Sequence, residues 1–158
     1  MKKILCTMLS LSLLVPAISF ASYESNHTAH TSPPYHAYYN GDPNWPIIWG
    51  VQGYAGYMDR SSVVILKDDE QGIKFAYRSL SIDFNRQSPK VRGYGTTWFY
   101  KPWSEPDIAY VKYKENGQWY RFRISDDHVY NWSKREGFLL GWEIAKGTEY
   151  HVGVTQAQ

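Results

Sequence analysis

The dipeptide Asn116-Gly117 constrains the fold of this chain more than any other feature. Asn-Gly readily adopts the left-handed backbone of a two-residue type I′ turn, so it is a strong signal for a β-hairpin. If these two residues form the whole loop, Ala109 lies opposite Ile124 and Val111 lies opposite Phe122. Both pairs are apolar and share one side of the hairpin. The sequence therefore predicts a ribbon with one face in the core.

The other face of the predicted hairpin combines basic and aromatic side chains. The same register pairs Tyr110 with Arg123, Lys112 with Arg121, and Lys114 with Trp119. Like charges directly opposite each other destabilise a hairpin slightly, and an anionic ligand would relieve that repulsion. The aromatic rings could stack on sugars or bases. A solvated outer face is the alternative interpretation and the more common one, because such single-face patterns are usual in antiparallel sheets. These six residues are the candidate ligand-binding residues, and the sequence assigns no catalytic residue.

Residues 1–21 have the features of a secretory signal peptide. Lys2 and Lys3 precede an apolar stretch, and Ser19-Phe20-Ala21 supplies small residues for cleavage. An N-terminal membrane anchor is the alternative interpretation. Cys6 is the only cysteine, so a cleaved chain has none and depends on packing alone. We expect a secreted, periplasmic or cell-surface protein with no membrane span in the mature chain.

The charge of the chain argues against a general attraction to nucleic acid. It has 17 Lys and Arg residues against 15 Asp and Glu residues, and Lys2 and Lys3 account for the excess. A cleaved chain is formally neutral, so electrostatic binding requires a local patch. The expected partners are a surface polysaccharide, another anionic polymer or a host matrix protein.

Residues 22–44 are polar, contain Pro33-Pro34 and have no apolar periodicity, which is typical of a flexible linker. His27, His30 and His36 fall in this segment, and imidazole is a common ligand of transition metals. Their irregular spacing and the lack of cysteine or carboxylate neighbours favour an ordinary tail. The sequence therefore predicts no metal site and no cofactor.

Residues 45–158 predict a single α+β domain with an antiparallel, meander-rich sheet of about six strands. The predicted strands are residues 45–51, 54–58, 63–67, 73–84 and 91–100, followed by the hairpin at 109–124. Residues 63–66 are a continuous apolar run, which is typical of a central strand covered on both faces.

Two long strands carry further signals. The apolar phase within residues 73–84 changes near Arg78 and Ser79, which predicts a β-bulge or sharp bend there. In the next strand, Gly93 and Gly95 share one face. They leave a smooth strip that a neighbouring element can approach closely.

One helix is predicted at about residues 134–146, packed on one face of the sheet. Residues 133–136 begin with Ser and end with Glu, the spacing of a capping box, and Gly147 is placed for the C-terminal stop. Apolar residues recur at helical spacing between these signals. Gly137 and Gly141 share one side and would let the helix approach the sheet closely.

The chain resembles two groups of proteins in its signal peptide, its C-terminal helix and the segment Tyr57-Met58-Asp59-Arg60-Ser61-Ser62-Val63. One comprises small secreted proteins of anaerobic bacteria with no assigned function, and the other is the surface-adhesin protein E family. The resemblance covers residues 45–155 in layout and only the Tyr-x-Asp-x-x-Ser-Val segment as a motif. It implies an antiparallel sheet with a helix, and a role in attachment to host proteins.

Two classes of function fit the sequence best. The first is a secreted or cell-surface, non-enzymatic binding or adhesion-type domain. The alternative is a small cell-envelope hydrolase that uses His128 and His151 with nearby carboxylates such as Asp126 and Glu149. A hydrolase requires a cleft that holds one of these histidines within hydrogen-bond reach of a carboxylate. A purely structural envelope protein is a third possibility.

Overall fold

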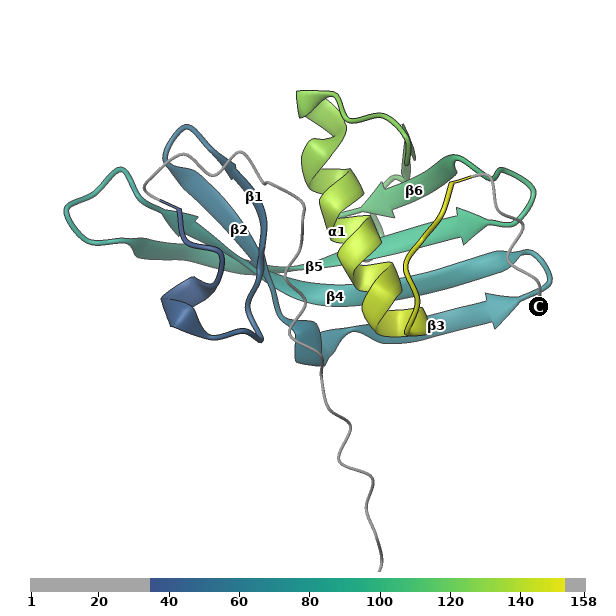
Figure 1. The fold of residues 1–158 in the computed structure, drawn as a ribbon, viewed down its shortest axis with the longest axis horizontal. Coiled ribbons are helices and arrows are strands. Elements are labelled where there is room, and N and C mark those ends of the chain that lie inside the picture. Colours follow the sequence, from purple (N-terminus) through teal and green to yellow (C-terminus); the bar gives the residue numbers. More distant parts are fainter. Residues whose placement is uncertain (1–34, 153–158) are drawn as a thin grey trace, which may run out of the picture.

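The structure, a computed structural model, describes residues 35–152 and is an α+β fold, as the sequence predicts (Figure 1). Its seven antiparallel strands are β1 (Ile47–Val51), β2 (Tyr54–Met58), β3 (Val64–Asp69), β4 (Gly72–Asp83), β5 (Lys90–Pro102), β6 (Ile108–Lys112) and β7 (Tyr120–Arg123). The helices are η1 (Tyr39–Gly41), η2 (Arg60–Ser62) and α1 (Val129–Lys146). The predicted signal peptide lies outside the described residues.

The sheet is organised around β4 and β5, which pair along their full length. The strand order is β1-β2-β4-β5-β6-β7, and β3 also pairs with β4. Residues 79–83 of β4 pair with β2, and residues 72–76 pair with β3 on the same edge. The chain therefore leaves β2, passes through η2 and returns to the same edge of β4 as β3.

The motif behind the family resemblance forms this connection. The Asp59 carboxylate accepts hydrogen bonds from the Ser61 N–H at 3.1 Å and from the Arg78 guanidinium at 2.8 Å. The Ser62 hydroxyl accepts from the backbone N–H of Arg78 at 2.7 Å. Asp59 is buried, so its carboxylate needs these partners. The local role of the motif is to fix η2 against β4.

The prediction that residues 63–66 form a covered central strand is wrong. Val64, Ile65 and Leu66 are 49, 41 and 54 % exposed because, among residues 35–152, β3 pairs with β4 alone and forms an edge of the sheet. The register shifts between Ile65 and Lys67. Such a bulge, together with the charged residues that follow, is a usual way to protect an edge strand from further pairing.

Of the two features that the sequence predicts near Arg78 and Ser79, a β-bulge or a sharp bend, the bulge is absent. The β4–β5 ladder is regular from Gly72 to Ser81, and its register shifts only between Ser81 and Ile82. Tyr77 and Leu80 therefore point to opposite faces of the sheet. The apolar phase changes because the two halves of β4 bury opposite faces.

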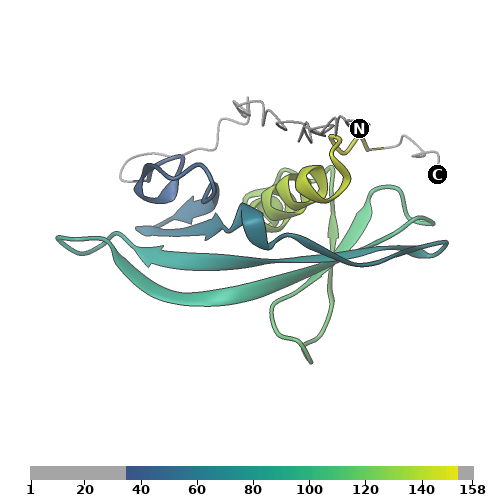
Figure 2. The same ribbon diagram turned by 90° about the horizontal axis from the view of Figure 1, so that it is seen from below.

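Two hydrophobic clusters result. The larger lies on the face covered by α1, and its buried residues are Ile48, Met58, Ile73, Phe75, Tyr77, Phe99, Ala109, Val111, Phe122, Ile124, Phe138 and Trp142. The smaller lies on the other face and contains Ala55, Tyr57, Leu80 and Ile82. The sheet twists strongly along β4 and β5, so η1 and α1 lie on the same side of the molecule in Figure 2 although they cover opposite sheet faces.

The segment before β1 covers the smaller cluster. Tyr35 and Tyr39 pack against it, and Tyr38 forms an isolated bridge with Pro46. The backbone N–H of Gly53 donates to the Tyr35 hydroxyl at 2.6 Å. Residues 35–44, which the sequence assigns to a flexible linker, are therefore part of the packed structure.

Helix α1 confirms the predicted C-terminal helix but begins at Val129, one turn earlier than expected. Ser133 consequently lies inside the helix and caps nothing, because the helical pattern continues unbroken through residues 129–133. Gly147 ends the helix in the left-handed conformation at φ 69°, as predicted. A Cβ at Gly141 would lie 2.6 Å from the Phe75 ring, so the predicted close approach is present.

The Asn-Gly hairpin exists, with the predicted faces but a different register. Ala109 lies opposite Phe122, and Tyr110 lies opposite Arg121. The Gly117 N–H donates to the Lys114 carbonyl at 2.9 Å, which makes a four-residue turn with glycine in its last position. Type I turns favour glycine there, so Asn-Gly need not occupy the centre of a type I′ turn. The shift equals two residues and leaves the same side chains in the core.

Candidate ligand-binding surface

One row of side chains crosses four strands on the sheet face that α1 does not cover. Lys74 of β4 pairs with Tyr100 of β5, Tyr100 with Tyr110 of β6, and Tyr110 with Arg121 of β7. Directly paired residues point to the same face of a sheet. Their side chains therefore run across it as cation, ring, ring, cation.

A second set of side chains lies beside this row. Trp98 pairs with Lys112, and Trp119 lies in the connection between β6 and β7. We define the aromatic–basic face as Lys74, Trp98, Tyr100, Tyr110, Lys112, Trp119 and Arg121. All but the exposed Arg121 are half-buried, so the rings are held in place yet remain accessible.

The rings of the aromatic–basic face contact each other and its lysines. Tyr100 stacks on Tyr110 with 6.1 Å between ring centroids and meets Trp119 edge-on at 6.3 Å. The Lys112 ammonium lies 5.4 Å from the Trp98 ring and 5.1 Å from the Trp119 ring. These distances are within the range of cation–π attraction. The lysine side chains thus help to fix the rings, and their positive charges lie beside the ring faces.

One carboxylate lies at the border of the face. Glu105 accepts a hydrogen bond from the Tyr110 hydroxyl at 3.0 Å and pairs with the Arg121 guanidinium at 3.4 Å. The pair is solvent-exposed and contributes little to stability. It shows that Arg121 and Tyr110 together can hold an anionic group on this face.

The structure brings together four of the six residues that the sequence proposes: Tyr110, Lys112, Trp119 and Arg121. Lys114 lies in the turn, and Arg123 lies further along β7, opposite Ile108. The predicted repulsion between Lys112 and Arg121 is absent, because Tyr110 is the residue opposite Arg121.

Sequence reasoning missed three members of the face, Lys74, Trp98 and Tyr100. Trp98 and Tyr100 alternate with the buried Phe99, and this alternation places them on the outer side of their strand. Which strands are neighbours is not evident from such a local pattern, so the pairing that gathers the rings needs the topology.

The histidines of the alternative hydrolase do not assemble a site. The His128 ring stacks on Tyr130 with 5.2 Å between centroids, and its backbone N–H donates to Asp126 at 3.0 Å. This N–H and the Asn131 side chain lower the pKa of Asp126. The Asp126 carboxylate therefore serves the start of α1. His151 is exposed, and within residues 35–152 neither imidazole hydrogen-bonds to a carboxylate.

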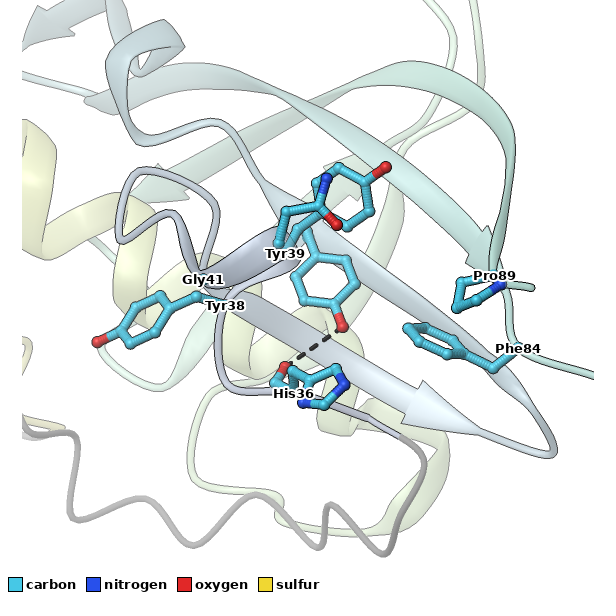
Figure 3. A pocket seen from close by; sticks show the side chains of 8 residues that line it. His36, Tyr38, Tyr39, Gly41, Phe84 and Pro89 are labelled. Atoms are coloured by element: carbon cyan, nitrogen blue, oxygen red, sulfur yellow. Dashed lines mark hydrogen bonds between the residues drawn. The ribbon is translucent and has the colours of Figure 1, made fainter. Parts of the chain in front are cut away.

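A small aromatic pocket lies elsewhere, between η1 and the β4–β5 loop (Figure 3). Its volume is about 320 Å³, and Phe84 and Pro89 face His36 and Tyr39 across it. The Tyr57 hydroxyl donates to the His36 carbonyl at 3.3 Å. This pocket contains none of the residues proposed from the sequence except His36.

The described residues contain no cluster of three or more His, Cys, Asp or Glu side chains that could hold a metal ion. His27 and His30 lie outside the described part of the chain. No helix between residues 35 and 152 is long and apolar enough to cross a membrane.

Comparisons of the chain with protein-family models, with curated proteins and with solved structures found no match.

Proposed function

We propose that this protein is a secreted or cell-surface binding domain that attaches to an anionic polysaccharide through its aromatic–basic face. The observation that carries the proposal is the row Lys74, Tyr100, Tyr110 and Arg121, in which two stacked rings lie between two cations. The flat apolar face of a sugar ring stacks on aromatic rings, and its carboxylate or sulfate groups pair with lysine and arginine.

The anionic group has a defined place in this proposal. Glu105 marks it, because its carboxylate bonds to Tyr110 and Arg121 together. A ligand carboxylate or sulfate takes the same position when Glu105 turns away, and the exposed ion pair costs little to break. Attachment to a host or neighbouring cell surface, as the family resemblance implies, follows from such binding.

The first test measures binding of the purified protein to dextran sulfate, with uncharged dextran as the matched polymer. We expect binding to dextran sulfate only, with an affinity that falls as salt is added. The double variant Lys74→Gln, Lys112→Gln should weaken binding and reduce its salt dependence. Trp119→Ala should weaken binding about tenfold with little change in salt dependence, because stacking is worth about 1–3 kcal/mol per ring.

The matched control removes the same charge from another place. Arg86→Gln, Lys90→Gln alters two exposed residues, one in the β4–β5 loop and one at the start of β5, and should leave binding unchanged. If wild type binds neither dextran sulfate nor heparin at low salt, the proposed function is wrong. If the control weakens binding as much as the Lys74, Lys112 variant, net charge and not this face is responsible.

A further inference from the structure

A groove lies on the sheet face that carries α1, next to the N-terminal part of the helix. Two adjoining hollows of about 220 and 390 Å³ share Trp49 and Ser79 in their walls. The smaller hollow reaches Ser133 and Lys134 of α1, and the larger reaches the β5 glycines Gly93 and Gly95. We name this surface the Trp49 groove.

Trp49 reaches the groove because of a bulge and a glycine. The register of β1 shifts between Ile47 and Trp49, so Ile48 and Trp49 both pack toward the α1 side of the sheet. The indole then lies directly on Gly56, where a Cβ would come within 2.0 Å of the indole Nε1. The backbone thus presents a flat aromatic surface beside the open floor of the groove.

The floor of the groove combines space with free polar groups. Gly93 pairs with Ser81, and Gly95 pairs with Ser79. The nearest atom to a Cβ built on Gly95 is the Ser79 hydroxyl oxygen at 3.9 Å, so no neighbouring element in the described part of the chain fills the strip that the sequence singles out. Among the described residues, the Trp49 indole N–H and the hydroxyls of Ser79 and Ser81 have no hydrogen-bond partner.

Two cationic side chains, Arg92 and Lys134, lie at the two ends of the groove, and each contacts another side chain of the protein. The Arg92 guanidinium lies 4.9 Å from the Tyr54 ring, and the Lys134 ammonium donates to the Asn131 side chain at 3.3 Å. No carboxylate of residues 35–152 lines either hollow. The central part of the groove therefore offers one ring face, two hydroxyls and an indole donor, without a net charge.

We propose that the Trp49 groove binds an uncharged oligosaccharide. A neutral sugar chain has both features that the groove requires: an apolar ring face for the indole and hydroxyl groups for the free donors and acceptors. A lipid or apolar peptide would leave the serine hydroxyls and the indole N–H unpaired, which is unfavourable once water is excluded. This site lies on the opposite sheet face from the aromatic–basic face and does not depend on the function proposed for it.

The test blocks the groove without removing any contact of the fold. Gly95→Val and Gly93→Val each place a β-branched side chain in the groove, where a Cβ meets nothing closer than 3.9 Å. Valine also suits a strand. Thr96→Val is the matched control, because residue 96 belongs to the same strand and points to the other face. All variants are checked by thermal melting before binding is measured.

The readout is the NMR cross-peak of the Trp49 indole N–H, assigned with Trp49→Phe, during titration with maltohexaose, cellohexaose and chitohexaose. We expect at least one of these neutral oligosaccharides to shift the peak with saturation. Gly95→Val and Gly93→Val should weaken that binding at least tenfold, and Thr96→Val should bind as wild type does. The proposal is overturned if none of the three sugars shifts the peak, or if both valine variants bind like wild type.

Discussion

Lys101 is the one fully buried cation among the described residues, at 2 % exposure. Its ammonium donates to the carbonyls of Pro102 and Glu105, at 2.7 Å each, and lies 5.9 Å from the Tyr150 ring. It therefore ties the β5–β6 loop to the sheet at Glu105, whose side chain lies at the border of the aromatic–basic face. Burial lowers the pKa of Lys101 to about 8, although Glu105 and Asp107 act in the opposite direction.

This pKa makes stability depend on pH in a defined direction. Between pH 8 and 10 the unfolded chain still holds the Lys101 proton and the folded chain loses it, so raising the pH favours folding. The unfolding free energy of wild type minus that of Lys101→Met should rise across this window by up to about 2 kcal/mol. Urea unfolding of both proteins at several pH values measures this difference in unfolding free energy. A difference that does not change with pH would show that the Lys101 ammonium is hydrated in the folded protein.

At the scale of elements, local signals predicted the strands and the helix stop, because each depends on neighbours in the sequence. The hairpin faces follow from alternation alone and are correct. The register depends on the turn type, and Asn116-Gly117 fits two turn types that differ by two residues. For α1 the capping-box spacing predicted the wrong first residue, because Ser133 also fits inside a helix that begins at Val129.

The contact between α1 and the sheet gives an element-scale prediction. Gly141→Ala should gain about 1 kcal/mol of helix propensity but lose about 1–3 kcal/mol by overpacking against Phe75. We expect a net loss of stability in urea unfolding. Ser133→Ala is the control in the same helix, and it should be neutral or slightly stabilising because Ser133 caps nothing. If Gly141→Ala and Ser133→Ala raise the unfolding free energy equally, the helix lies further from the sheet than in the structure.

At the scale of the whole molecule, each face of one twisted sheet is covered over only part of its length. Helix α1 covers part of one face and leaves the Trp49 groove, whereas the N-terminal segment covers part of the other face and leaves the aromatic–basic face. Both candidate sites combine residues from at least three strands or connections. The sequence could propose the hairpin's share of one site, but the long-range pairing that completes both sites has no local signature.

The N-terminal cover gives the last prediction. A chain that begins at residue 45, the predicted domain boundary, loses Tyr35 and Tyr39, which pack on the smaller cluster beside Phe84 and Tyr57. Compared with a chain that begins at residue 35, it should be less stable by about 3 kcal/mol, because two half-buried rings together lose about as much packing as one truncated core ring. Urea unfolding of the two chains measures the difference. The full-length double variant Tyr35→Ala, Tyr39→Ala should lose a similar amount, since it removes the same rings without moving the terminus. If the shorter chain unfolds at the same urea concentration as the longer one, residues 35–44 are a linker after all, and the smaller cluster is stable without its cover.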